Sequence, residues 1–142
     1  MKKLTTQATI SSYINQDTEQ PILQSIMVFI NNTHELLLSS EKIDEIQTAL
    51  SEAINNVAVF AYPNKQGKVS VYISIYDNKV LKLKVRDFGC GIEDIEKARA
   101  PFFTTETGHS GMGFAIMKTF SDKLTVKSML GKGTIVTMEF KM

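Results

Sequence analysis

The sequence predicts an α+β fold: a two-layer α/β sandwich in which a mixed, mostly antiparallel sheet carries helices on one face. Two observations predict it. Residues 69–76 and 80–86 alternate apolar and polar side chains on either side of an Asp77-Asn78 turn, as the strands of a β-hairpin do. Residues 41–62 carry apolar side chains at helical spacing over a broad stripe. Hairpins with helices between them favour such a sandwich.

The elements before the hairpin are one strand and two helices. Residues 4–10 alternate apolar and polar side chains, which predicts an edge strand. A helix is expected to begin at residues 17–21, where a capping side chain, an early acid and a proline come together, and to continue through residues 22–30. The second helix, over residues 41–62, is expected to end at the Pro63-Asn64 pair.

The elements after the hairpin are two helices, a loop and a second hairpin. Residues 92–100 predict a short helix closed by a proline, and residues 103–110 predict a loop because they have no period and are rich in Thr and Gly. A third long helix is expected over residues 111–121. Residues 124–129 and 134–141 alternate again and predict the closing hairpin.

Length and composition favour a single domain over residues 1–142. The chain carries 16 basic and 15 acidic side chains, so no overall field favours direct binding to nucleic acid or a membrane. We recognise no secretion signal and no segment long enough to span a bilayer. Cys90 is the single cysteine, which excludes an intrachain disulfide and fits a reducing compartment. We therefore expect a cytoplasmic protein.

Asp87 is the most informative residue of the chain. In the strand before it, residues 81–85 place apolar side chains at odd numbers and basic ones at even numbers. Asp87 continues the apolar parity, so its carboxylate points toward the core, where it needs hydrogen-bond donors. Gly89 and Gly91 follow and allow backbone to approach a ligand closely. The pattern predicts a buried hydrogen-bonding site for a flat polar ligand.

Polar side chains on two other elements share this orientation. Glu52 and Asn56 are spaced i, i+4 beside the buried stripe of their helix, so both reach one spot at the rim of the core. Thr134 shares the parity of the apolar residues of the last strand. Alone, Glu52 and Asn56 are better explained by an ordinary polar boundary, and Thr134 by β-propensity. Together with Asp87, all of them are expected to line one rim.

A second glycine segment, Ser110-Gly111-Met112-Gly113-Phe114, lies just before an apolar helix. Backbone N–H groups at a helix start, not covered by Cβ atoms, form an anion site suited to phosphates. A single Gly-x-Gly is explained equally well by a turn. Its combination with the Asp87-Phe88-Gly89-Cys90-Gly91 segment makes a nucleotide site the better interpretation.

Four segments resemble the boxes of the GHKL ATPase superfamily. Residues 51–56 resemble the N-box, residues 87–92 the first glycine box, residues 110–117 the second glycine box, and residues 131–134 the final Gly-Thr element. Within the superfamily the chain resembles the stand-alone anti-sigma factor serine kinases of the anti-sigma F type, and its length and residues 101–105 fit that group.

The resemblance implies the Bergerat ATP-binding fold, with ATP and Mg²⁺ as cofactors. Asp87 would accept a hydrogen bond from the adenine amino group, with Thr134 assisting through water, and Asn56 would hold Mg²⁺. The second glycine box would cradle the phosphates, and residues 104–109 would form a lid. Glu52 would be the general base toward a serine hydroxyl of an anti-anti-sigma partner. The residues that the resemblance places at the nucleotide are Asn56, Asp87, Gly89, Gly91, Ile92, Thr104, Thr105, Ser110, Gly111, Met112, Gly113, Phe114 and Thr134.

The chain departs from the family pattern at two functional positions. Phe60-Ala61-Tyr62 stands where relatives carry His-Gly-Tyr, so a polar side chain is missing. His109 stands where close relatives carry Arg, and it would occupy that catalytic position with less positive charge. These departures bear on the rate of phosphoryl transfer more than on nucleotide binding. Residues 22–30 do not match the partner-contacting helix of the anti-sigma F type, so the sigma partner stays open.

The expected function is therefore a homodimeric anti-sigma factor that binds Mg·ATP, sequesters a sigma factor and phosphorylates a serine of its antagonist, in the regulation of sporulation transcription. A nucleotide-gated binding module without useful kinase activity is the alternative. A detached ATPase domain of a histidine kinase is a third hypothesis, which the poor context of His34 as a phospho-acceptor disfavours.

Overall fold

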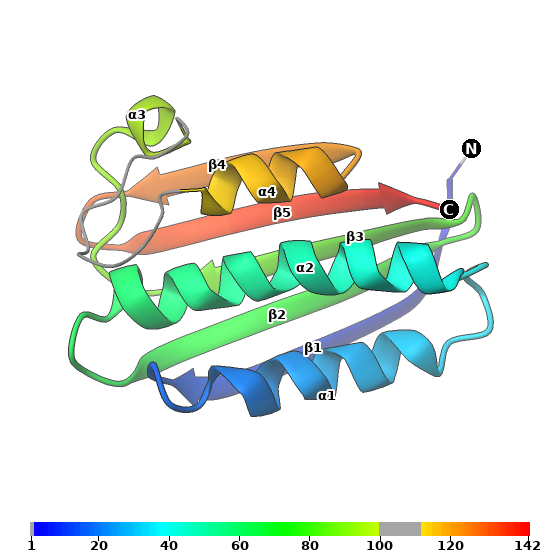
Figure 1. The fold of residues 1–142 in the computed structure, drawn as a ribbon, viewed down its shortest axis with the longest axis horizontal. Helices are drawn as coiled ribbons and strands as arrows, with labels where there is room; N and C mark the ends of the chain where they lie inside the picture. The colour runs from blue at the N-terminus through cyan, green and yellow to red at the C-terminus, as the bar shows by residue number, and fades with distance from the viewer. Residues whose placement is uncertain (1, 100–111) are drawn as a thin grey trace.

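The structure, a computed structural model, describes residues 2–99 and 112–142 (Figure 1). The strands are β1 (Leu4–Ile14), β2 (Gly67–Tyr76), β3 (Val80–Asp87), β4 (Lys123–Met129) and β5 (Gly133–Lys141). The helices are α1 (Glu19–Asn31), α2 (Ser40–Asn56), the π-helix η1 (Val57–Ala61), α3 (Ile95–Arg99) and α4 (Gly113–Phe120). The order of elements agrees with the sequence prediction, and the α+β class is confirmed.

The strands form one sheet in the order β1-β2-β3-β5-β4, and every pairing is antiparallel. The expectation of a mixed sheet is therefore wrong. The crossover from β3 through α3 and α4 does bring β4 back parallel to β3. However, β5 folds back from β4 and inserts between these two strands, so no parallel pair is formed.

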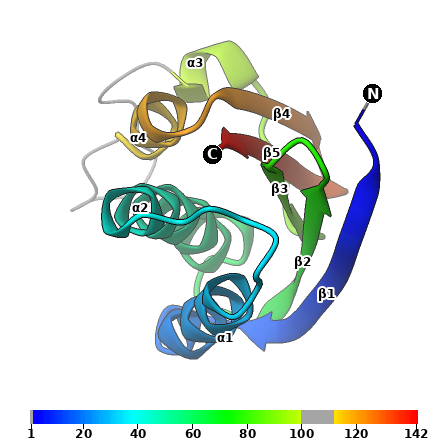
Figure 2. The same ribbon diagram turned by 90° about the vertical axis from the view of Figure 1, so that its right-hand side faces the viewer.

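The helices α1, α2 and α4 lie on one face of the sheet, as expected (Figure 2). The core fills the space between these layers with aliphatic side chains from both, including Ile26, Leu50, Ile73 and Leu83. Among the helices of residues 2–99 and 112–142, none is long and apolar enough to cross a membrane.

Strand parity aims Asp87 and Thr134 at this core. On β3 the odd-numbered Leu81, Leu83 and Val85 are buried, and Asp87 shares their face with 6% of its surface exposed. On β5, Thr134 is 8% exposed and shares the buried face of the even-numbered residues. Both predictions of orientation are confirmed.

The second helix differs from its prediction near its C-terminal end. It begins at Ser40, capped by the Ser39 hydroxyl, which accepts a hydrogen bond from the Lys42 N–H at 3.1 Å. The expected continuous α-helix through Tyr62 ends at Asn56, and Val57–Ala61 form a π-helix instead. Apolar residues continue through both segments, so the hydrophobic pattern does not distinguish them. Helical turns of this kind occur frequently at functional sites.

Candidate functional site

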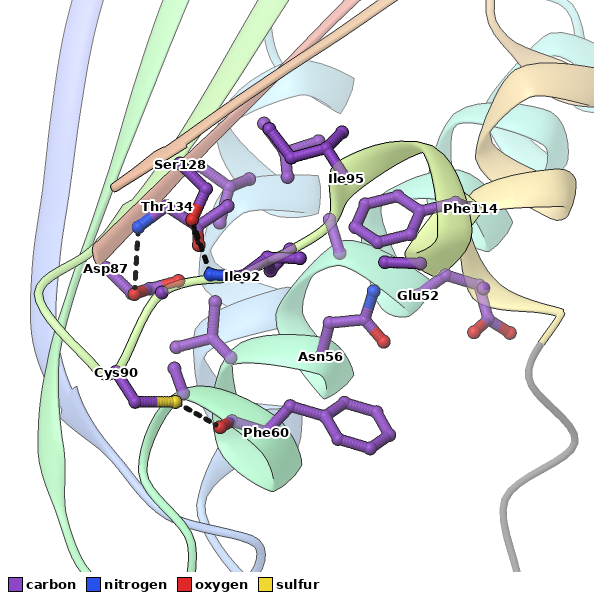
Figure 3. Close-up of a pocket in the computed structure, with 18 of the residues that line it drawn as sticks. Glu52, Asn56, Phe60, Asp87, Cys90, Ile92, Ile95, Phe114, Ser128 and Thr134 are labelled. Carbon is purple, nitrogen blue, oxygen red and sulfur yellow. Dashed lines mark hydrogen bonds between the residues drawn. The ribbon is translucent and has the colours of Figure 1, made fainter. Parts of the chain in front are cut away.

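A cavity of about 1250 Å³ lies between the C-terminal half of α2, the loop after β3, the start of α4 and the ends of the central strands. Figure 3 shows Asp87, Ser128 and Thr134 on one side of it and Asn56 and Glu52 on the other. The cavity is large enough for a drug-sized ligand or a nucleotide.

Asp87 provides a buried hydrogen-bond acceptor at one end of the cavity. Its Oδ1 accepts hydrogen bonds from the backbone N–H groups of Gly89, at 3.0 Å, and Thr134, at 3.2 Å. Its Oδ2 makes no hydrogen bond within the described residues and is left for a ligand. Burial raises the pKa of the Asp87 carboxyl, and the two N–H donors partly offset this rise.

Ser128 completes the polar group around Asp87. Its hydroxyl lies 2.7 Å from the Thr134 hydroxyl and accepts a hydrogen bond from the Ile92 N–H at 2.7 Å. Ser128 is not among the site residues predicted from the sequence. A signal was available, because Ser128 shares the even parity of Leu124 and Val126 on the inner face of β4.

Glu52 and Asn56 meet the start of α4 at the other end of the cavity. A Cβ on Gly113 would lie 3.2 Å from the Asn56 Oδ1 and 3.4 Å from the Glu52 Oε2, so the start of α4 lies directly against both side chains. Burial raises the pKa of the Glu52 carboxyl, which makes it a better proton acceptor near neutral pH. The i, i+4 spacing thus brings the carboxylate and the amide to one spot, as predicted.

The loop after β3 is held from two sides. The Cys90 N–H donates to the Ala61 carbonyl at the end of the π-helix, at 3.2 Å, and the Cys90 carbonyl accepts from the Gly131 N–H at 2.7 Å. Gly91 has a φ of +77°, and a Cβ there would lie 2.3 Å from the Met129 carbonyl oxygen. This glycine is therefore required both for its backbone conformation and for close packing.

Most of the predicted site residues gather at the cavity. Those that line it are Glu52, Asn56, Asp87, Gly91, Ile92, Met112, Gly113, Phe114 and Thr134. Gly89 acts beside it, through its N–H bond to Asp87. The predictions for Thr104, Thr105, His109, Ser110 and Gly111 lie outside the described residues. Three residues that were not predicted as site residues also line the cavity: the half-buried Asn55 and Phe60 and the exposed Cys90.

The sequence is similar to a protein family and to curated relatives. Residues 20–140 match the family described as histidine kinase-like ATPase domain. An anti-sigma F factor of Caldanaerobacter subterraneus subsp. tengcongensis is 50% identical over 100 residues, which are 69% of each chain. An anti-sigma F factor of Geobacillus stearothermophilus is 45% identical over 104 residues, covering 71% of this chain and 70% of the relative.

The fold is similar to solved structures at lower identity. The histidine kinase domain of a blue-light activated histidine kinase from Erythrobacter litoralis matches 86% of this chain with a TM-score of 0.60 and 22% identity. The match spans 58% of the length of that kinase domain. The RsbU and RsbW domains of a Mycobacterium tuberculosis protein match 96% of this chain, over 32% of their own, with a TM-score of 0.62 and 15% identity.

Proposed function

We propose a function for this chain on the premise that it belongs to the histidine kinase-like ATPase family and, within that family, to the anti-sigma F factors. The resemblance seen in the sequence is thereby confirmed. The chain binds Mg·ATP in the cavity, transfers the γ-phosphoryl group to a serine of an anti-anti-sigma antagonist, and sequesters a sigma factor as a homodimer. Residues 1–142 act as one domain.

The observation that carries this proposal is the environment of Asp87. A buried carboxylate with one oxygen bonded to backbone N–H groups and the other without a partner in the described residues is suited to accept a hydrogen bond from a ligand. The exocyclic amino group of adenine is such a donor. The Thr134 hydroxyl, 2.7 Å from Ser128, is available to a neighbouring ring nitrogen through water.

The other end of the cavity fits the phosphates and a magnesium ion. At Gly113 the N-terminus of α4 approaches the Asn56 amide, and the first N–H groups of a helix have no partner within that helix. The described residues contain no cluster of three His, Cys, Asp or Glu side chains that could hold a metal by themselves. Magnesium is often held by few protein oxygens together with waters and substrate phosphates, which fits a single ligand from Asn56. When bound, it would neutralise phosphate charge.

Glu52 is proposed as the general base. In the transfer step the serine hydroxyl oxygen forms a bond to the γ-phosphorus, its proton passes to the Glu52 carboxylate, and the bond between the γ-phosphorus and the bridging oxygen of ADP breaks. The raised pKa of the Glu52 carboxyl supports this role because it strengthens the base. His109, beyond the described residues, would assist with positive charge, while Thr104, Thr105, Ser110 and Gly111 would close over the phosphates.

A nucleotide-gated binding module is the second candidate, and Phe60 favours it. Phe60 presents an apolar ring to the cavity where relatives carry a histidine. Such a module would bind Mg·ATP and its protein partner without useful kinase activity.

One experiment separates the two candidates. The protein is incubated with Mg·ATP and an anti-anti-sigma protein from the same genome, and phosphoserine is followed by mass spectrometry. Phosphoserine that disappears in Glu52→Gln supports the kinase. ATP binding by calorimetry without any phosphoserine supports the module and removes the kinase.

A further inference from the structure

We infer that Tyr62 is a positioning residue for adenine recognition. Its hydroxyl bridges β2 and β3 by hydrogen bonds to the backbone of both, and so holds the end of the strand that carries Asp87. The inference deepens the proposed function and rests on its assignment of Asp87 to the adenine amino group. Tyr62 itself does not line the cavity and acts through Asp87.

The strand register shows where the hydroxyl sits. Val69 and Asp87 form the last registered pair of β2 and β3 at this end of the hairpin. The next residues along are Lys68 and Phe88. The Tyr62 hydroxyl donates to the Lys68 carbonyl at 2.6 Å and accepts from the Phe88 N–H at 2.7 Å. One side-chain hydroxyl therefore takes the place of a backbone ladder bond.

The surroundings of Tyr62 leave it little freedom. Tyr62 is 6% exposed, and a Cβ on Gly67 would lie 2.2 Å from its ring, so the ring packs directly on that glycine. Burial raises the pKa of the Tyr62 hydroxyl, with the nearby Asp87 charge contributing, which keeps the donor protonated. On the outer surface, the Arg86 guanidinium lies 4.7 Å from the centre of the Phe88 ring.

The consequence falls on the Asp87 carboxylate. The N–H of the peptide group between Asp87 and Phe88 donates a hydrogen bond to the Tyr62 hydroxyl. The next N–H along the chain, that of Gly89, donates to Asp87 Oδ1. Loss of the hydroxyl leaves the Phe88 N–H and the Lys68 carbonyl without this partner, so the backbone at the strand end is free to rotate. The Asp87 carboxylate is then held less firmly in the orientation that points Oδ2 toward a ligand.

The test compares two nucleotides that differ in one group. Purine riboside triphosphate lacks only the 6-amino group of ATP, so the ratio of its Kd to that of ATP measures recognition of that group. In Tyr62→Phe, ATP affinity is expected to fall about tenfold and the affinity for purine riboside triphosphate to change less than about twofold. A merely structural defect would reduce the competent fraction for both nucleotides equally and leave the ratio unchanged.

Two further proteins sharpen the result. Tyr72→Phe is the matched control, because Tyr72 is half-exposed on β2 and its hydroxyl makes no hydrogen bond within the described residues. It should keep the wild-type ratio. In an Asp87→Asn background, Tyr62→Phe should cause no further loss of the ratio if it acts through Asp87.

The outcomes distinguish this inference from the proposed function. A wild-type protein that binds both nucleotides equally overturns the adenine assignment and the inference with it. A wild-type protein that prefers ATP, with the same ratio in Tyr62→Phe, overturns the inference alone and leaves the proposed function standing.

Discussion

Gly113 packs closely against Asn56: a Cβ on Gly113 would lie only 3.2 Å from the amide Oδ1 of Asn56. The first residue of α4 and the last residue of α2 therefore meet at one point, with the Glu52 carboxylate beside them. A side chain at Gly113 would therefore require the Asn56 amide to shift by a few tenths of an ångström.

Gly113→Ala should therefore separate folding stability from binding. Alanine favours a helix interior by up to about 1 kcal/mol, but Gly113 is the first residue of α4, so Tm should change little. The added methyl group displaces the Asn56 amide, so Mg·ATP affinity should fall about tenfold, or about 1.4 kcal/mol. Calorimetry and thermal unfolding measure the two effects. Thr119→Ala, an exposed change on the same helix, should leave affinity unaltered. Unchanged affinity in Gly113→Ala would remove the phosphate role of this contact.

Glu52→Gln should stop phosphoryl transfer while nucleotide binding continues. Loss of a general base lowers kcat by roughly 10² to 10⁴. The amide keeps the size of the side chain, so the Kd for Mg·ATP should stay within about threefold. Glu41→Gln, an exposed change at the start of the same helix, is the control for both measurements. If Glu52→Gln abolished ATP binding, the role of Glu52 as a base would be wrong.

The ligand-free protein should lose stability as Asp87 ionises. Burial raises the pKa of this carboxyl above its usual 3.8, so the folded state holds the proton more tightly than the unfolded state. The fold is therefore penalised as pH rises from about 3.8 through the raised pKa, and the penalty is complete above it.

Asp87→Asn removes that penalty. Its Tm without nucleotide should match or exceed the wild-type Tm at about pH 7, and this advantage should shrink as the pH is lowered toward about 4, because more of the wild-type carboxyl is then protonated. Glu52, whose carboxyl pKa is also raised by burial, is present in both proteins and cancels from the comparison. A lower Tm for Asp87→Asn at about pH 7 would contradict this account.

Mg·ATP should protect Cys90 from alkylation. Cys90 is the single cysteine, it is exposed, and it lines the cavity. Iodoacetamide labelling, followed by mass spectrometry, should slow in proportion to the fraction of protein that is bound. In Asn56→Ala, which is expected to lose nucleotide binding, the same concentration of Mg·ATP should give no protection. Equal labelling of the wild-type protein with and without nucleotide would mean that the ligand sits elsewhere.

The sequence allowed the orientation of the key side chains to be predicted because strand parity and helical spacing are local. The odd parity of residues 81–85 predicted a buried Asp87, and the i, i+4 spacing predicted that Glu52 and Asn56 meet. Both depend only on neighbouring residues along one element.

The remaining features depend on contacts between distant segments. The insertion of β5 between β3 and β4 is set by how the last hairpin docks, which no local pattern encodes. The hydrogen bonds of the Tyr62 hydroxyl to Lys68 and Phe88 depend on how the π-helix places Tyr62 against the hairpin. The alternation in β4 predicts that Ser128 faces inward, but only the structure shows its hydroxyl beside that of Thr134 at the site.

The most direct test of the central claim is a calorimetric titration of Mg·ATP into the wild-type protein and into Asp87→Asn. We expect the wild-type protein to bind one ATP per chain and Asp87→Asn to bind at least about tenfold more weakly, because a buried charged acceptor is lost while the fold persists. A wild-type protein without measurable affinity, or an Asp87→Asn protein with wild-type affinity, would contradict the assignment of this cavity to ATP.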